Sequence, residues 1–260
     1  MCNFTLKSED RLRLGIKKEQ ALFIFLSACT IFVTKIVFIM LIVLEGLDGA
    51  GKSTQINLLK GYYEEKGAEV RLLHFPRFDT PVFGEMIAKF LRGDFGAIEN
   101  VHPMLVALIY AEDRRDAAPM LREWLDAGVV VILDRYLYSN IAFQCAKAAT
   151  EEEAEFLRNW ILETEFNTFA IPKPDVNLFL DVPLEFVEEK LSSSRKGDDR
   201  EYLKGKKDIH EESLLFQERV RKFYLKECGK GLQRVECSDG NGKMLSAGDN
   251  FKKILSSIEI

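Results

Sequence analysis

The segment from Gly46 to Ser53 combines glycines with a lysine and a hydroxyl at a spacing that suits phosphate chemistry. It reads Gly-Leu-Asp-Gly-Ala-Gly-Lys-Ser and follows the pattern G-x-x-x-x-G-K-[ST]. In this pattern the glycines let backbone N–H groups approach phosphate oxygens, the lysine reaches the β- and γ-phosphates, and the hydroxyl holds Mg²⁺. The segment therefore predicts binding of a nucleoside triphosphate with its Mg²⁺ ion. The residues expected to contact ATP are Gly46, Leu47, Asp48, Gly49, Ala50, Gly51, Lys52, Ser53 and Thr54.

The sequence on either side of this loop predicts the elements that hold it. An apolar run before the loop is typical of a buried strand, and Thr54–Glu65 has the apolar periodicity of a helix. Two longer helical patterns cover Pro103–Asp126 and Glu151–Phe166. Because apolar runs and helical patterns alternate, we expect an α/β fold with a five-stranded parallel sheet and helices on both faces. The expected strands are Leu41–Leu44, Val70–Leu73, Val129–Leu133, Val176–Leu180 and Gln233–Glu236.

The composition fits a globular protein with one large domain or two small ones. The chain has 260 residues, of which 47% are hydrophobic, which is ample for a core. Its net charge of −5 gives no sign of nucleic-acid binding. The five cysteines show no metal-binding spacing and leave one over after pairing, which favours reduced thiols in the cytosol.

The first 39 residues differ in character from the rest. Residues 21–33 are almost wholly apolar and follow a basic segment, so a signal peptide or a membrane anchor formed by residues 21–44 has to be considered. The run is short for a membrane span, and Lys35 interrupts it. The interpretation that fits best is a protein that starts at Met40. Residues 1–39 would then be a non-native extension, and residues 40–260 the functional domain.

A polar, basic stretch at residues 192–207 follows the fourth expected strand and lacks apolar periodicity. It is either a solvated loop or a mobile lid over phosphates, and its position in the chain favours the lid.

Two arginines follow expected strands beside the glycine-rich loop. Arg77 belongs to Phe-Pro-Arg after the second strand, and Arg135 belongs to Asp-Arg-Tyr after the third. Ligands of open parallel sheets bind beyond the carboxyl ends of the strands, and guanidinium groups match phosphate as a fork. A third arginine, Arg114, lies inside the long helical pattern. These residues favour a second, anionic substrate.

The residues after the second strand also indicate the kind of phosphoryl acceptor. A nucleoside hydroxyl loses a proton during attack and needs a carboxylate base there, but this position holds Phe75-Pro76-Arg77. A monophosphate already presents an anionic oxygen and needs positioning and charge neutralisation instead. The sequence therefore favours a kinase acting on a nucleoside monophosphate.

Five segments, in this order, resemble thymidylate kinases: LEGLDGAGKST, FPRFDTP, IYAEDR, DRYLYSN and PKPD. The resemblance runs from about Met40 to the C-terminus. It implies a P-loop kinase fold with a mobile lid, and transfer of the γ-phosphoryl of ATP to dTMP with Mg²⁺ in dTTP synthesis. It also implies a cytoplasmic homodimer. Two positions depart from the family pattern, because Phe78 replaces a frequent tyrosine and Ala50 stands where some members carry arginine.

The resemblance further implies roles for individual side chains in the acceptor site. Tyr110 would stack on thymine, and Arg114 would reach its O4 atom. Arg135 would bind the acceptor phosphate together with Arg77, while Phe143 would crowd the 2′ position and disfavour ribonucleotides. The whole implied dTMP site consists of Asp48, Phe75, Arg77, Tyr110, Arg114, Arg135, Asn140, Phe143 and Asp208.

Phosphoryl transfer and the metal ion account for the remaining implied roles. The implied catalytic residues are Lys52, Arg135 and the lid arginines Arg195 and Arg200. The implied metal-binding residues are Ser53, Asp134 and Glu211.

Several alternatives remain open from the sequence. Tyr110 and Phe143 could be core residues, and Asn140 could cap a helix or a turn. The chain could be a kinase of the same fold for another nucleotide or a deoxynucleoside. From a different class, it could be a membrane-tethered nucleotide-binding regulator without catalysis.

Overall fold

The computed structural model describes residues 40–97, 100–192 and 214–258, all within the unit Met40–Ile260. Two sequence-based expectations fall outside these residues. One is the interpretation of residues 1–39 as an extension or an anchor, and the other is the lid, of which only residue 192 is described.

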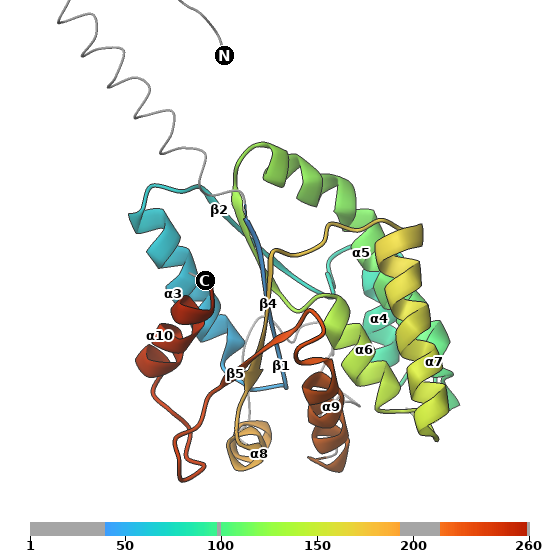
Figure 1. The fold of residues 1–260 in the computed structure, drawn as a ribbon. Helices are drawn as coiled ribbons and strands as arrows, with labels where there is room; N and C mark the ends of the chain where they lie inside the picture. The colour runs from blue at the N-terminus through green and yellow to red at the C-terminus, as the bar shows by residue number, and fades with distance from the viewer. Residues whose placement is uncertain (1–39, 98–99, 193–213, 259–260) are drawn as a thin grey trace, which may run out of the picture. The chain divides into compact units, whose positions relative to one another are not determined.

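The core of the described unit is a five-stranded, fully parallel sheet with the strand order β2-β3-β1-β4-β5. This confirms the predicted fold class. Val, Ile and Leu dominate the central strands, which are buried on both faces because helices cover both sides (Figure 1). The strands are β1 (Met40–Gly46), β2 (Val70–His74), β3 (Val130–Asp134), β4 (Val176–Asp181) and β5 (Gln233–Glu236).

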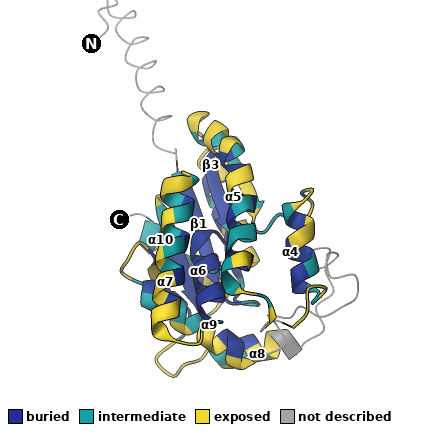
Figure 2. Ribbon diagram, turned by 90° about the vertical axis from the view of Figure 1, so that its right-hand side faces the viewer, coloured by how far each residue is buried: buried dark blue, intermediate teal, exposed yellow. Residues whose placement is uncertain are grey.

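The helices form two layers around this sheet. In Figure 1, α3 and α10 lie together on one face, whereas α5, α6 and α7 cover the opposite face, and α9 packs against α6. Figure 2 shows α6 in dark blue between its neighbours, because nearly all of its residues are buried. The helices are α3 (Lys52–Glu65), α4 (Phe83–Leu91), α5 (Pro103–Asp126), α6 (Leu137–Cys145), α7 (Glu151–Leu162), α8 (Leu184–Ser192), α9 (Leu214–Glu227) and α10 (Ala247–Ile258).

One helix departs from its predicted form. A single helix was expected over Glu151–Phe166, but α7 ends at Leu162 and the chain continues as a π-helical turn, η2, over Glu163–Thr168. A π turn adds a residue to each hydrogen-bonded turn and so rotates the following side chains around the axis. In η2 the side chain of Glu165 is completely buried.

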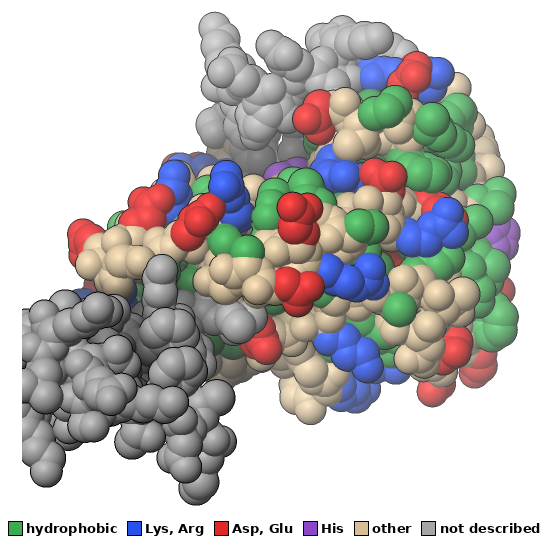
Figure 3. All heavy atoms as spheres, turned by 90° about the horizontal axis from the view of Figure 1, so that it is seen from above, with side chains coloured by type: hydrophobic (Ala, Val, Ile, Leu, Met, Phe, Trp, Pro, Cys, Tyr) green, Lys and Arg blue, Asp and Glu red, His purple; other side chains and the backbone are tan. Residues whose placement is uncertain are grey.

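The surface seen in Figure 3 carries basic, acidic and apolar side chains intermixed with one another. Within the described ranges, no helix combines the length and apolar character that a bilayer crossing requires.

Asp181, at the end of β4, is a buried carboxylate shared by two arginines. Arg221 of α9 donates to it from Nε and Nη2 at 2.6 and 3.0 Å, and Arg234 of β5 donates from Nε at 2.7 Å. The carboxylate therefore joins the end of the sheet to α9.

We predict that Asp181→Ala lowers the free energy of unfolding by about 2 kcal/mol, because it removes the charge-assisted hydrogen bonds that a buried carboxylate accepts from two partly exposed arginines. Urea denaturation measures this change. Glu236→Ala is the matched control, since Glu236 is an exposed partner of Arg234 at 3.4 Å, and its loss should cost less than about 0.5 kcal/mol. Equal losses of unfolding free energy in the two variants would contradict a stabilising role for the buried carboxylate of Asp181.

Candidate active site

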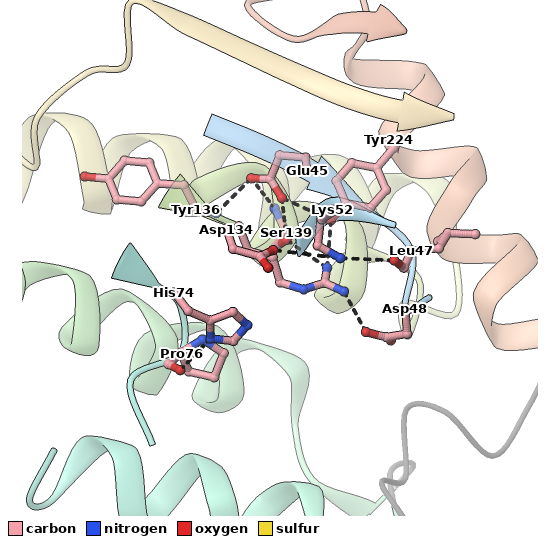
Figure 4. A network of polar contacts seen from close by, with 11 residues as sticks. Glu45, Leu47, Asp48, Lys52, His74, Pro76, Asp134, Tyr136, Ser139 and Tyr224 are labelled. Atoms are coloured by element: carbon pink, nitrogen blue, oxygen red, sulfur yellow. Dashed lines mark hydrogen bonds and ion pairs between the residues drawn. The ribbon is translucent and has the colours of Figure 1, made fainter. Parts of the chain in front are cut away.

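The glycine-rich loop joins β1 to α3 as predicted. Gly49 and Gly51 have φ values of 78° and 81°, a backbone region that suits glycine and places Gly51 at the start of α3. Lys52 is folded over the loop, where its Nζ donates to the carbonyl oxygen of Leu47 at 3.1 Å (Figure 4). Burial lowers the pKa of Lys52, and the nearby Arg135 lowers it further. A phosphate oxygen would give this buried ammonium group a stronger partner than a carbonyl.

Asp134, the last residue of β3, fits the predicted metal site. Its Oδ1 atom is buried, has no hydrogen-bond partner within the described ranges, and lies 3.9 Å from Nζ of Lys52. Ser53 stands exposed in the first turn of α3. Carboxylate and hydroxyl oxygens are suitable partners for Mg²⁺, which proteins commonly hold with one or two carboxylates plus substrate phosphates and water. Asp134 and Ser53 therefore offer oxygens whose chemistry suits Mg²⁺.

Arg135 lies at the centre of the candidate site, at the carboxyl end of β3. Its backbone has a φ of 67°, and its N–H donates to the carbonyl of Leu44 in β1 at 2.9 Å. The guanidinium group donates to Asp48 Oδ1 at 2.6 Å and to Ser139 Oγ at 3.2 Å, and lies 5.1 Å from the ring centre of Phe143. Burial acts against its charge, but the carboxylate of Asp48 and other neighbours raise the pKa of Arg135 above its ordinary value. The arginine is therefore a fixed cation beside the phosphate-binding loop.

A buried carboxylate that the sequence reasoning missed organises this end of the sheet. Oε1 of Glu45, in β1, accepts from the N–H groups of Tyr136 and Ser139 at 3.0 and 3.1 Å. These N–H groups belong to the start of α6, so Glu45 caps that helix from a different element. Its Oε2 accepts from the hydroxyls of Ser139 and, at 3.2 Å, Tyr224 (Figure 4). The sequence signal for this role was the position of Glu45, a charged residue at the end of an apolar strand and directly before the phosphate-binding loop.

Arg77, which was predicted to help bind the acceptor phosphate, is held after the end of β2 by two aspartates of α5. Its Nε atom donates to Asp113 Oδ1 at 2.9 Å, and its Nη2 atom donates to Asp116 at 2.7 Å. Asp113 also accepts from the backbone N–H of Arg77. Phe75, another predicted contact, is buried with its ring 5.5 Å from that of Tyr136. Arg77 and Phe75 thus anchor the segment after β2 to α5 and to the segment leading into α6.

Arg114 and Asn140, two residues of the predicted dTMP site, meet at a buried glutamate for which the sequence predicted no role. Arg114 of α5 donates to both carboxylate oxygens of Glu165, and Asn140 of α6 donates to one of them at 2.9 Å. Tyr110 lies one turn before Arg114 and is half-buried against Phe90 and neighbouring apolar residues. The structure therefore groups Tyr110 with Arg114 on α5, and Arg114 with Asn140 across α5 and α6.

Beside the loop lies a cavity of about 240 Å³, and the predicted ATP contacts Ala50, Gly51 and Thr54 are among the residues that line it. Loop residues and residues between β5 and α10 form much of its mostly apolar wall. Residues that line it include Ala50, Thr54, Phe186, Met244, Leu245 and Ala247. The predicted site residues Arg195, Arg200, Asp208 and Glu211 lie outside the described residues.

Burial raises the pKa of Glu45 above its ordinary value of 4.5, although the hydrogen bond from Ser139 and the charge of Arg135 oppose this shift. Between pH 4.5 and the raised value, the folded state binds more protons at this site than the unfolded state. The contribution of Glu45 to stability should therefore fall as pH rises through this window. We predict that the unfolding free energy of the wild type, minus that of Glu45→Gln, decreases as the pH rises through this window. Denaturant titrations at several pH values measure this difference. A difference independent of pH would contradict this.

Comparisons with known proteins agree with this geometry. Residues 44–244 match the family model described as thymidylate kinase. A probable thymidylate kinase of Thermococcus kodakarensis is 37% identical over 192 residues, which cover 72% of this chain and 83% of that protein. The thymidylate kinase of Mycobacterium tuberculosis is 32% identical over 193 residues, covering 74% and 87%.

A solved structure gives the same answer. The thymidylate kinase of Candida albicans, described as having broad substrate specificity, superposes with a TM-score of 0.63 at 26% identity, covering 85% of this chain and 91% of that one. These comparisons give no support to the two alternatives, a membrane-tethered nucleotide-binding regulator and a kinase of the same fold with another acceptor. With its phosphate loop, its buried arginine after β3 and these relatives, the chain belongs to the thymidylate kinase family of phosphotransferases.

Proposed function

We propose that this protein transfers the γ-phosphoryl group of ATP to dTMP, giving ADP and dTDP for dTTP synthesis. The observation that carries the proposal is the placement of Arg135, a buried cation fixed beside the phosphate loop by Asp48 and Ser139. Membership of the thymidylate kinase family supports dTMP as the acceptor.

The donor phosphates would bind on the loop, where Lys52 exchanges the carbonyl of Leu47 for phosphate oxygens. The adenine of ATP would enter the adjoining cavity, whose mostly apolar wall suits a planar base. A Mg²⁺ ion at Ser53 and Asp134, with Glu211 beyond the described residues, would neutralise phosphate charge. The loop fixes the position of the donor before transfer.

The acceptor phosphate would bind to Arg135, with Arg77 as a second cation that keeps its contacts to α5. The phosphate already carries an anionic oxygen, so no general base is required, and alignment with the γ-phosphorus is the main task. Asp48 now holds the guanidinium of Arg135 and would share it with the incoming phosphate. Arg195 and Arg200 of the proposed lid would cover the transferring group and exclude water.

The thymine ring would bind between Tyr110 and the polar groups of α5 and α6. Oδ1 of Asn140 is a buried acceptor without a partner in the described part of the chain. The N3–H group of thymine is a donor and would satisfy it, while Arg114 would donate to O4. Phe143, near Arg135, would crowd the 2′ position.

We further propose that the enzyme is a cytosolic homodimer. The three described cysteines, Cys145, Cys228 and Cys237, are free thiols, which suits a reducing compartment. Leu105 of α5 is 60% exposed and would be an apolar contact in a dimer.

ADP release with Mg·ATP, in the presence of dTMP, dUMP, dGMP, AMP, thymidine or no acceptor, tests the proposal. Turnover stimulated mainly by dTMP is the expected result. Slow hydrolysis that does not depend on the acceptor would overturn it.

Arg135→Ala should raise the KM for dTMP by about 30- to 100-fold, the cost of a charge-assisted contact to phosphate, and leave the KM for ATP nearly unchanged. Lys52→Ala is the matched comparison, since it should lower kcat by about 10³-fold through loss of charge stabilisation on the donor side. Steady-state kinetics with each substrate varied in turn gives both parameters. Equal losses for both substrates in Arg135→Ala would argue against its role.

Phe143→Ala should lower the preference for dTMP over its ribonucleotide about tenfold, because the space for a 2′-hydroxyl opens. The ratio of kcat/KM for the two acceptors measures this preference. Phe143→Leu keeps most of the bulk and serves as the control. Unchanged discrimination in Phe143→Ala would leave Phe143 as a core residue.

A further inference from the structure

Three buried polar side chains from three different elements meet behind the proposed thymine site. They are Arg114 of α5, Asn140 of α6 and Glu165 of η2, and each is at most 2% exposed. Glu165 is the common partner, because Arg114 donates to it from Nε and Nη2 and Asn140 donates from Nδ2. Glu165 has no role in the proposed reaction, and both of its carboxylate oxygens are occupied by hydrogen bonds from Arg114 and Asn140.

The cluster fixes which way the amide of Asn140 points. Its Nδ2 atom donates one hydrogen to the backbone carbonyl of Ala107 at 3.0 Å and the other to Glu165 at 2.9 Å. A carbonyl and a carboxylate are both acceptors, so only the NH₂ side of the amide can face them. Oδ1 therefore points elsewhere, and it is the atom left without a partner among the residues that the structure covers.

The same carboxylate orients the guanidinium of Arg114. Because Nε and Nη2 face Glu165, the Nη1 atom is the part of the fork that donates to no described residue. Together, the cluster presents one donor from Arg114 and one acceptor from Asn140.

This donor–acceptor pair distinguishes pyrimidines by the groups at positions 3 and 4. Thymine and uracil carry an N3–H donor and an O4 acceptor, which complement Asn140 and Arg114. Cytosine has the opposite arrangement, with an unprotonated N3 and an amino group at position 4. A buried site built for one arrangement rejects the other strongly, because mismatched polar groups stay unpaired.

We propose that Glu165 is a positioning residue that sets the selectivity of this enzyme for a thymine-type base over a cytosine-type base. It acts through Arg114 and Asn140 and does not touch the substrate. The π turn is what brings Glu165 to this place, consistent with the frequent occurrence of such turns at functional sites. The inference rests on the proposed dTMP site and adds the residue that gives this site its hydrogen-bond polarity.

The test compares dTMP with 5-methyl-dCMP, which differ only at N3 and C4 of the base. Calorimetric titration of the full chain gives the dissociation constant of each nucleotide. The readout is the selectivity ratio, which is the dissociation constant of 5-methyl-dCMP divided by that of dTMP. In Glu165→Gln the new amide is uncharged and donates as well as accepts, so only the carbonyl of Ala107 still favours the native orientation of Asn140. We expect dTMP to bind at least tenfold more weakly and the ratio to fall at least tenfold, with ATP affinity within twofold.

Glu163→Gln is the matched control, because Glu163 lies in the same π turn but is exposed and pairs with Asn167. It should change neither constant by more than twofold. Glu165→Asp is the second variant and carries the test if Glu165→Gln does not fold. It keeps the charge but is too short to hold both partners, so dTMP affinity and the ratio should each fall at least threefold.

A ratio that stays at the wild-type value in a folded Glu165 variant would overturn the inference, because a merely structural role weakens both nucleotides alike. Failure of the proposed function has a different signature, in which the wild type itself neither binds nor phosphorylates dTMP.

Discussion

The carboxylate of Glu45, buried at the end of β1, is the interaction on which the candidate active site depends. A charge at this depth is costly unless hydrogen bonds compensate for it, and here the start of α6 supplies two N–H groups while Ser139 and Tyr224 supply hydroxyls. Through these bonds β1, which carries the phosphate loop, is tied to α6, which carries Asn140 and Phe143. Arg135 lies between the two elements and donates to Ser139.

This arrangement explains how the site can be ordered before any ligand binds. The phosphate loop, the proposed cation for the acceptor phosphate and the groups proposed to bind the base all lie on strands or helices or directly at their ends. Their positions are set by parallel strands that end at one edge of the sheet, and by buried carboxylates that connect neighbouring elements. Glu165 connects α5 and α6 at the proposed base-binding end of the site, as Glu45 connects β1 and α6 beside the phosphate loop. Preorganised groups of this kind lower the cost of aligning two substrates.

The sequence predicted the parts whose physics is local. The phosphate loop needs glycines at fixed spacing, and the five apolar runs need burial on both faces, so the sheet and the position of the loop between β1 and α3 were predicted correctly. Partners far apart in the chain could not be read in this way. Glu45 and Tyr224 are 179 residues apart, and the pairing of Arg114 with Glu165 needs a π turn inside a helical pattern. The contact of Arg77 with Asp113 could not be predicted either, because it arises only once β2 and α5 are packed together.

The central claim is that Arg135 is already in place for the acceptor phosphate. It is held by Asp48 and by Ser139, whose hydroxyl also donates to Glu45. A crystal structure of the complex with dTMP tests this most directly. The account predicts that the guanidinium keeps its bond to Ser139 while at least one of its nitrogens contacts the phosphate. A complex in which Arg135 has turned away, with the phosphate held by other groups, would contradict it.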